Sequence, residues 1–191
     1  MARVKEYNRE AVLERAIALF WGKGYEATSV SDLVKATGLN SASMYKDFGN
    51  KDAFFEQVLD HYETTMLEPF YRILVEEPSL KSLEDFLDAI AYYSALREYR
   101  GCLMLNSVAE QRYIGDKSVK RVEKYCVKIA IIFENAIRSA QRAGEIPKDK
   151  DPEQMANFML CFVQGLSAYG RIGDHKKNIK SIIDMIKMTL K

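Results

Sequence analysis

The chain has 191 residues, 48% of them hydrophobic, and a formal net charge of only +1 at pH 7. This hydrophobic content is sufficient for a substantial core, and the near-neutral charge excludes a polycation that binds nucleic acid by overall attraction. The N-terminus lacks the apolar stretch of a signal peptide, and the longest strongly apolar run, Ile129 to Phe133, is too short to cross a bilayer, so we expect a cytoplasmic protein without a membrane partner.

Helical signals begin close to the N-terminus. Residues Asn8 to Trp21 have apolar side chains at helical spacing, and two glycines follow them. Ser29, with Asp32 three residues later, is the pattern of a reciprocal capping box and predicts the start of a second helix. Gly38 lies where that helix must end, because glycine adopts the left-handed conformation without a Cβ clash.

A third helix is expected directly after this turn, with Asn40 as its cap. One side of the helix should face the core and the other should face outward: Met44, Tyr45 and Phe48 inward, and Ser41, Ala42 and Ser43 outward. Two short helices joined by a glycine-containing turn, the second with small side chains near its start, form the helix-turn-helix arrangement that enters the major groove of DNA.

The remaining chain has helical periodicity and no strand signal. A fourth helix is expected from Asn50 to about Val75, with a kink at Pro69, because proline cannot donate to the carbonyl four residues earlier. The next helix should start at Ser82, with Asp85 three residues on, and run to about Arg97. Further helices are expected over residues 101–111, 116–143, 151–170 and 177–190. The sequence therefore predicts an all-α protein of about nine helices.

Two blocks, Ala16 to Val34 and Thr37 to Lys51, resemble the N-terminal domain of the TetR family, the tetracycline-repressor-like transcriptional regulators. The resemblance implies a DNA-binding domain over residues 1–51 and a helical effector-binding and dimerisation domain over residues 52–191. It also implies a homodimeric repressor that a small-molecule or redox effector releases from a palindromic double-stranded operator. Asp47 departs from the family pattern, which more often has histidine or tyrosine, and a carboxylate there opposes a phosphate contact.

Base contacts are expected from the start of the third helix, and phosphate contacts from its flanks and from Thr28 or Ser29. For Asn40, a cap without DNA contact is the alternative. Lys51 begins the fourth helix, where backbone N–H groups also attract an anion. Arg3 and Lys5 could form a minor-groove arm or belong to a tail without a role. The candidate DNA-binding residues are Thr28, Ser29, Asn40, Ser41, Ala42, Ser43, Tyr45, Lys46 and Lys51.

Aromatic and sulfur-containing side chains of the second domain could line an apolar effector pocket, although each one alone also fits an ordinary core. The candidates are Tyr92, Tyr93, Cys102, Met104, Tyr125, Phe133, Met159 and Phe162.

Among these candidates, Cys102 has the most specific sequence context. It follows Arg100 and Gly101 at the start of a predicted helix, and a helix N-terminus and a cation both lower the pKa of a thiol. The segment is also similar to a Gly-Cys segment in one branch of TetR-like regulators. A redox- or electrophile-sensing thiol is one hypothesis, and a buried small apolar residue is the other.

The helix over residues 151–170 is apolar on nearly every side, so it requires cover on every side. Pairing it and the isoleucine-rich last helix with their symmetry mates predicts a four-helix dimer interface. The alternative is a central core helix within one subunit. The candidate interface residues are Met155, Phe158, Phe162, Leu166, Ile179, Ile182, Ile183 and Ile186.

Other function classes have weaker support. The two histidines, His61 and His175, stand in no metal or triad pattern, and the three cysteines have no metal-ligand spacing. We therefore expect free thiols, no metal, no cofactor and no catalytic site, which disfavours a small helical enzyme. A helical adaptor that has lost DNA binding is a further alternative, and Asp47 is the main reason to consider it. The operator, the effector and the choice between repressor and activator remain open.

Overall fold

The computed structural model describes residues 7–96, 98–172 and 176–191, and these residues form helices and no strands. The expected helix end at Arg97 and the arm residues Arg3 and Lys5 lie outside the described residues. In chain order the elements are α1 (Arg9–Lys23), α2 (Val30–Thr37), α3 (Ser41–Phe48), α4 (Lys51–Tyr62), the π-helical η1 (Glu63–Leu67), α5 (Glu68–Glu76), α6 (Leu80–Ser94), α7 (Leu103–Ala109), α8 (Asp116–Arg142), α9 (Pro152–Tyr169) and α10 (Lys176–Leu190).

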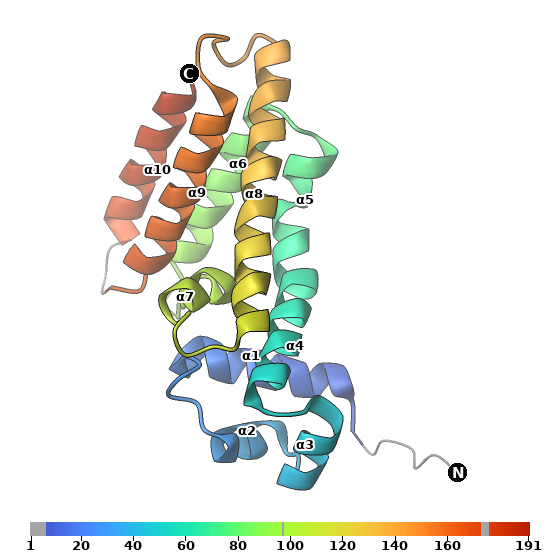
Figure 1. Cartoon of the computed structure of the whole chain (residues 1–191). Coiled ribbons are helices and arrows are strands. Elements are labelled where there is room, and N and C mark those ends of the chain that lie inside the picture. Colours follow the sequence, from blue (N-terminus) through green and yellow to red (C-terminus); the bar gives the residue numbers. More distant parts are fainter. Residues whose placement is uncertain (1–6, 97, 173–175) are drawn as a thin grey trace.

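Because α4, η1 and α5 follow one another without a break, the described residues form nine separate helices, which confirms the predicted all-α class. Figure 1 shows α1, α2 and α3 as a small head at one end of the molecule and α5, α6, α8, α9 and α10 as a bundle at the other. The α4 helix leaves the head and continues into the bundle, and α7 lies at the junction. One cluster of buried side chains runs through both parts.

Capping hydrogen bonds confirm the predicted starts of several helices. The Ser29 hydroxyl accepts from the N–H of Asp32, and the Asp32 carboxylate accepts from the N–H of Ser29. Asn40 and Asn50 cap α3 and α4 without a reciprocal partner, since their side chains accept from the N–H groups of Ser43 and Ala53, and Asp151 caps α9. These contacts satisfy N–H groups that have no partner within their own helix.

Two details differ from the expectations. The α6 helix begins at Leu80 because Ser79 is its cap, with Ser82 as the reciprocal partner, so Ser82 lies inside the first turn. Between Asn50 and Glu76 the chain contains the π-helical η1 immediately before Pro69. The proline nitrogen cannot donate a helical hydrogen bond, and a wider helical turn directly before it accommodates this loss. Such turns are frequent at functional sites.

Candidate nucleic-acid interface

The outer face of α3 is presented at the far end of the head (Figure 1). Met44 and Phe48 are buried, and the centre of the Phe48 ring lies 4.4 Å from that of the Phe54 ring in α4 and 4.3 Å from the Arg9 guanidinium in α1. Asn40, Ser41, Ala42 and Lys46 are exposed, and Ser43 is half-buried. Tyr45, expected to point inward, is 52% exposed instead, because its position lies one residue outside the stripe that Met44 and Phe48 define. A solvent-exposed helix start of this kind is available to a DNA groove.

Thr28 and Ser29 have different surroundings. The Thr28 side chain is buried and its hydroxyl donates to the carbonyl of Gly24, 2.5 Å away. Ser29 is exposed at the start of α2, where Asp32 accepts from both its backbone N–H and its hydroxyl. Lys23 lies 2.6 Å from the Asp32 carboxylate. Hydrogen bonds from Lys23 and then Ser29 hold the pKa of Asp32 well below its usual range. Of the two residues, only Ser29 is exposed, and a phosphate would have to compete with Asp32 for its two donors.

Lys51 is half-buried at the start of α4. Its ammonium lies 4.1 Å from the centre of the Tyr25 ring and 3.5 Å from the carbonyl of Glu26. Burial lowers the pKa of Lys51. The side chain is thus held in place by the turn before α2, and its charge lies beside the N-terminus of α4.

Asp47 is occupied within the head. The Tyr7 hydroxyl donates to its carboxylate over 2.6 Å, and the Arg9 guanidinium donates to its backbone carbonyl. Burial, and then the hydrogen bond with Asp47, raises the pKa of Tyr7 to about 12. The carboxylate therefore ties the C-terminal end of α3 to the residues just before α1.

One short segment makes several contacts with both the head and the bundle, and the sequence did not indicate this role for it. We call residues Tyr99–Cys102 the strap. The Trp21 indole donates to the carbonyl of Gly101 over 3.0 Å, and Arg100 donates to the carbonyl of Ala18 over 3.2 Å. On its other side, the strap is fixed to α9, because the Ser167 hydroxyl accepts from the N–H of Cys102 over 2.8 Å.

Glu110, at the end of α7, makes a further contact between the two parts. Its carboxylate accepts from the N–H groups of Tyr25 and Glu26, at 3.0 and 3.2 Å, in the turn between α1 and α2. These partners are 85 and 84 positions apart in the chain. No local sequence pattern signals such a pair, because neither residue type nor spacing links the two elements.

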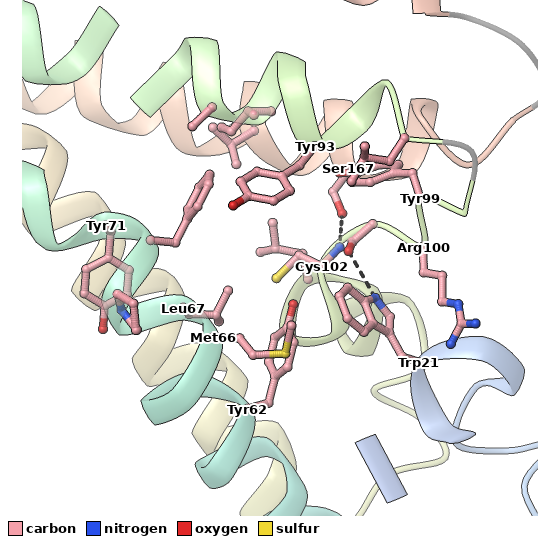
Figure 2. Close-up of a pocket in the computed structure, with 18 of the residues that line it drawn as sticks. Trp21, Tyr62, Met66, Leu67, Tyr71, Tyr93, Tyr99, Arg100, Cys102 and Ser167 are labelled. Carbon is pink, nitrogen blue, oxygen red and sulfur yellow. Dashed lines mark hydrogen bonds between the residues drawn. The ribbon is translucent and has the colours of Figure 1, made fainter. Parts of the chain in front are cut away.

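A cavity of about 650 Å³ lies between the strap, η1, α5, α6 and α8 (Figure 2). Its wall is mostly aromatic and aliphatic, and Trp21 of the head contributes to it. The volume falls in the range of about 300–1,000 Å³ that is usual for small-molecule sites.

The expected effector residues divide into three groups. Tyr93, Cys102 and Tyr125 line the cavity. Met104, Phe133 and Met159 are buried in the core and do not belong to the wall of this cavity. Tyr92 is 66% exposed and Phe162 is half-buried on α9, and neither belongs to the wall. Residues of the wall that the sequence did not indicate include Tyr62, Met66, Phe70 and Tyr99.

Cys102 occupies the N-cap position of α7 without a capping hydrogen bond from its side chain, and its sulfur points into the cavity (Figure 2). Burial raises the pKa of the Cys102 thiol, so the lowered pKa expected from the sequence is wrong. Desolvation outweighs the helix N-terminus here, and Arg100 does not face the sulfur, because its guanidinium points away toward α1 (Figure 2). All three cysteines are free thiols.

The expected dimer residues lie on two different faces. Leu166, Ile179, Ile183 and Ile186 are at most 4% exposed within one subunit, so they cannot present a surface to a partner. The isoleucine stripe of α10 is covered instead by the subunit's own bundle. Phe158 is 50% exposed, and Met155, Phe162 and Ile182 are half-buried. Exposed methionines on α10, Met185 and Met188, extend this outer apolar face.

Within the part of the chain that the structure describes, no helix is long and apolar enough to cross a membrane. The same residues contain no group of three or more acidic, histidine or cysteine side chains suited to a metal ion.

Comparisons with known proteins agree with this architecture. Among curated proteins, the chain is 33% identical over 183 residues to the HTH-type transcriptional repressor ComR of Escherichia coli (strain K12), covering 94% of this chain and 87% of that protein. It is 29% identical over 176 residues to the HTH-type transcriptional repressor BdcR of the same strain, covering 90% and 83%. Among solved structures, a cysteine mutant of the TetR family transcriptional regulator CifR complexed with 26-bp double-strand operator DNA has a TM-score of 0.84 at 22% identity, covering 99% of this chain and 100% of that one.

Two family models also match. The family of bacterial regulatory proteins named tetR matches residues 12–58, and the tetracyclin repressor-like C-terminal domain matches residues 79–186, which is more than half of the chain. This chain therefore belongs to the tetR family of bacterial regulatory proteins.

Proposed function

We propose that this chain is a homodimeric transcriptional repressor that binds a palindromic operator through α3 and is released by a small molecule in the cavity. The observation that carries the proposal is the exposed start of α3, held on a head that contacts the cavity wall through the strap. ComR and BdcR are named as repressors, and CifR was solved with operator DNA, which supports the same role here. Binding to the chromosome implies a cytoplasmic location.

In this proposal the head, residues 1–51, reads DNA and residues 52–191 bind the effector and dimerise. Asn40, Ser41, Ala42 and Ser43 face base edges. Phosphates are held by the exposed or half-buried donors at the flanks of α3, which are Ser29, Tyr45, Lys46 and Lys51.

Two heads are required, because a helix-turn-helix dimer reads half-sites about 34–36 Å apart. An effector shifts this spacing only if it binds more tightly to the conformation that does not fit the operator. The strap and α4 both contact the cavity and the head, so either can transmit a change in cavity occupancy to α3.

A gel-shift experiment tests the proposal. Duplexes that tile the DNA flanking the gene are titrated with wild-type protein, a Lys46→Ala variant and a Lys148→Ala control outside the head. We expect one palindromic duplex to bind, with a Kd that rises steeply with salt because phosphate contacts release counterions. Lys46→Ala should weaken binding and flatten the salt dependence, and the control should match the wild type. A folded dimer that binds none of the duplexes would support the adaptor alternative.

An electrophilic or oxidising effector is a second candidate, favoured by the position of the Cys102 sulfur in the cavity wall. In that case Cys102→Ser should abolish any oxidant-induced loss of operator binding. An unchanged response in the Cys102→Ser protein would leave non-covalent binding as the function of the cavity.

A further inference from the structure

We infer that the cavity takes an uncharged, largely apolar molecule with one neutral hydrogen-bonding group, and that it rejects anions and cations. The inference rests on the proposed function of the cavity as the effector site and adds the chemical class of its ligand.

The charges around the cavity lead to this class. Among the described residues of its wall, only Glu98 and Arg100 are charged. Glu98 is exposed, and the Arg100 guanidinium donates to the carbonyl of Ala18 and points away from the cavity (Figure 2). An ionised ligand in the interior would therefore lose its hydration without meeting a fixed opposite charge, which is strongly unfavourable.

A nearby group of charges is already paired. Glu63 is buried, and its carboxylate lies 2.9 Å from Lys128 and 3.1 Å from Arg121. Lys128 also contacts Glu68 at 3.2 Å. None of these side chains belongs to the cavity wall, and the nearest approach is that of Lys128, 5.2 Å from the centre of the Tyr71 ring. Because Glu63 and Glu68 already pair with Lys128, the cluster joins η1 to α8 and leaves no unpaired charge for a ligand.

The wall offers apolar contact and several neutral polar groups. Met66, Leu67, Phe70 and Phe86 provide aliphatic and aromatic surface from η1, α5 and α6. Neutral polar groups also line the wall: the Tyr62 hydroxyl, which accepts from the N–H of Leu103 at 3.3 Å, and the neighbouring Cys102 thiol. Both are neutral near pH 7 because burial raises their pKa values. The other hydroxyl-bearing residues of the wall are Thr65, Tyr71, Tyr93, Tyr99, Tyr125 and Ser167. A ketone, an ester, an ether or an aromatic ring without a basic or acidic group fits this lining, whereas a carboxylate or ammonium does not.

Two dyes with one common framework test the ligand class. N-phenyl-1-naphthylamine is neutral, and 8-anilinonaphthalene-1-sulfonate has the same rings with an added sulfonate. Fluorescence titration of the full chain without DNA should show the neutral dye binding at one per subunit. The sulfonate should bind more weakly by about tenfold or more, because its charge would be buried without a partner.

Substitutions locate the binding and reverse its charge preference. Met66 lies on η1, is 44% exposed and faces the cavity, so Met66→Lys adds a cation to the wall without burying it completely. This variant should bind the sulfonate more tightly and the neutral dye more weakly. Val75→Lys, on the adjoining α5 and 57% exposed, adds the same charge outside the wall and should leave both affinities unchanged.

A second substitution in the cavity wall changes its volume without changing its charge. Ala89→Phe fills the cavity from α6 with an apolar ring and should abolish binding of the neutral dye. The circular dichroism spectrum of the variant should remain that of the helical wild type. Equal affinities of the two dyes for the wild type, or neutral-dye binding insensitive to both wall variants, would overturn the inference. A protein that binds operator but prefers the sulfonate refutes only the ligand class. One that binds the neutral dye but no DNA refutes only the proposed function.

Discussion

At the level of single residues, burial decides the chemistry of Cys102. Cys102 stands at the cap of a short helix, a position that favours a thiolate in an open setting. Its sulfur faces an apolar cavity, and desolvation of the charged form raises its pKa. The thiol is therefore protonated under physiological conditions and is a neutral group of the cavity wall.

This protonation state predicts the order of alkylation of the cysteines. At pH 7.5, iodoacetamide should modify the exposed Cys161 before Cys102, by about tenfold or more in rate, because only thiolates react. A raised pKa means that the protonated form persists to higher pH, so the rate at Cys102 should rise mainly above pH 8.5, the ordinary thiol range. Peptide mass spectrometry measures both rates. Faster labelling at Cys102 at pH 7.5 would contradict the buried thiol.

Lys46 within α3 and Lys51 at the start of α4 should behave differently when they are replaced by alanine. Lys46 is exposed, so Lys46→Ala should reduce operator affinity and the salt slope by about one unit without changing stability. Lys51 lies over the Tyr25 ring, so Lys51→Ala should also lower the free energy of unfolding, by about 0.5–1 kcal/mol. Urea unfolding and a salt series of binding isotherms separate the two effects. Equal stability of the two variants would show that the Tyr25 contact contributes nothing.

Among the elements, the strap connects three parts that are distant in sequence. Its residues contact α1 through Trp21, α9 through Ser167 and the cavity through Cys102. Gly101 permits this close packing. Its φ is +75°, and a Cβ there would lie 2.8 Å from both the carbonyl oxygen and the hydroxyl of Ser167. A side chain at this position must displace the strap from α9.

Gly101→Ala should therefore lower the free energy of unfolding by more than the backbone strain. That strain alone costs about 1–2 kcal/mol for a residue with a Cβ in the left-handed conformation. Gly144→Ala is a matched control, because Gly144 has a φ of +76° and no atom near the position of an added Cβ. The control should show only the conformational cost, and Gly101→Ala should show an additional loss and weaker binding of the neutral dye. Urea unfolding of both variants measures the difference. Equal losses would mean that the strap moves freely against Ser167.

For the whole molecule, we propose that exposed apolar side chains of α9 and α10 decide the oligomeric state. Phe158 of α9 and Met185 and Met188 of α10 are 50–70% exposed, and large exposed apolar patches mark interaction sites. The isoleucines of α10 are unsuited to test dimerisation. Ile183→Glu would place a charge at a site that is 1% exposed and would unfold the subunit before it separated a dimer.

Phe158→Glu is the informative substitution. It should convert the dimer into a monomer of 21.9 kDa, because a charge at the centre of an apolar interface is desolvated without a partner. The subunit fold should persist, since the side chain is half exposed. Sedimentation velocity measures the mass, and Val75→Glu, outside α9 and α10, serves as the control. A dimeric Phe158→Glu protein would place the interface elsewhere.

The sequence by itself determined the local features of the fold. The caps Ser29, Asn40, Asn50 and Asp151 were predictable because an N-cap and its partner N–H groups lie within four residues of each other. The turn at Gly38 was predictable for the same reason. The exposed start of α3 followed from these caps, and with it most of the candidate DNA-binding surface.

Only the tertiary structure decided which neighbour covers each apolar face. Helical periodicity shows that Ile179, Ile183 and Ile186 share one side of α10, but it does not show whether that side meets the subunit's own core or a partner. The contact of Glu110 with the turn at Tyr25 and the fit of Gly101 against Ser167 join residues that no spacing rule relates. The cavity, the raised pKa of Cys102 and the connection between cavity and head all arise from this long-range packing, because burial is a property of the assembled helices and not of any one segment.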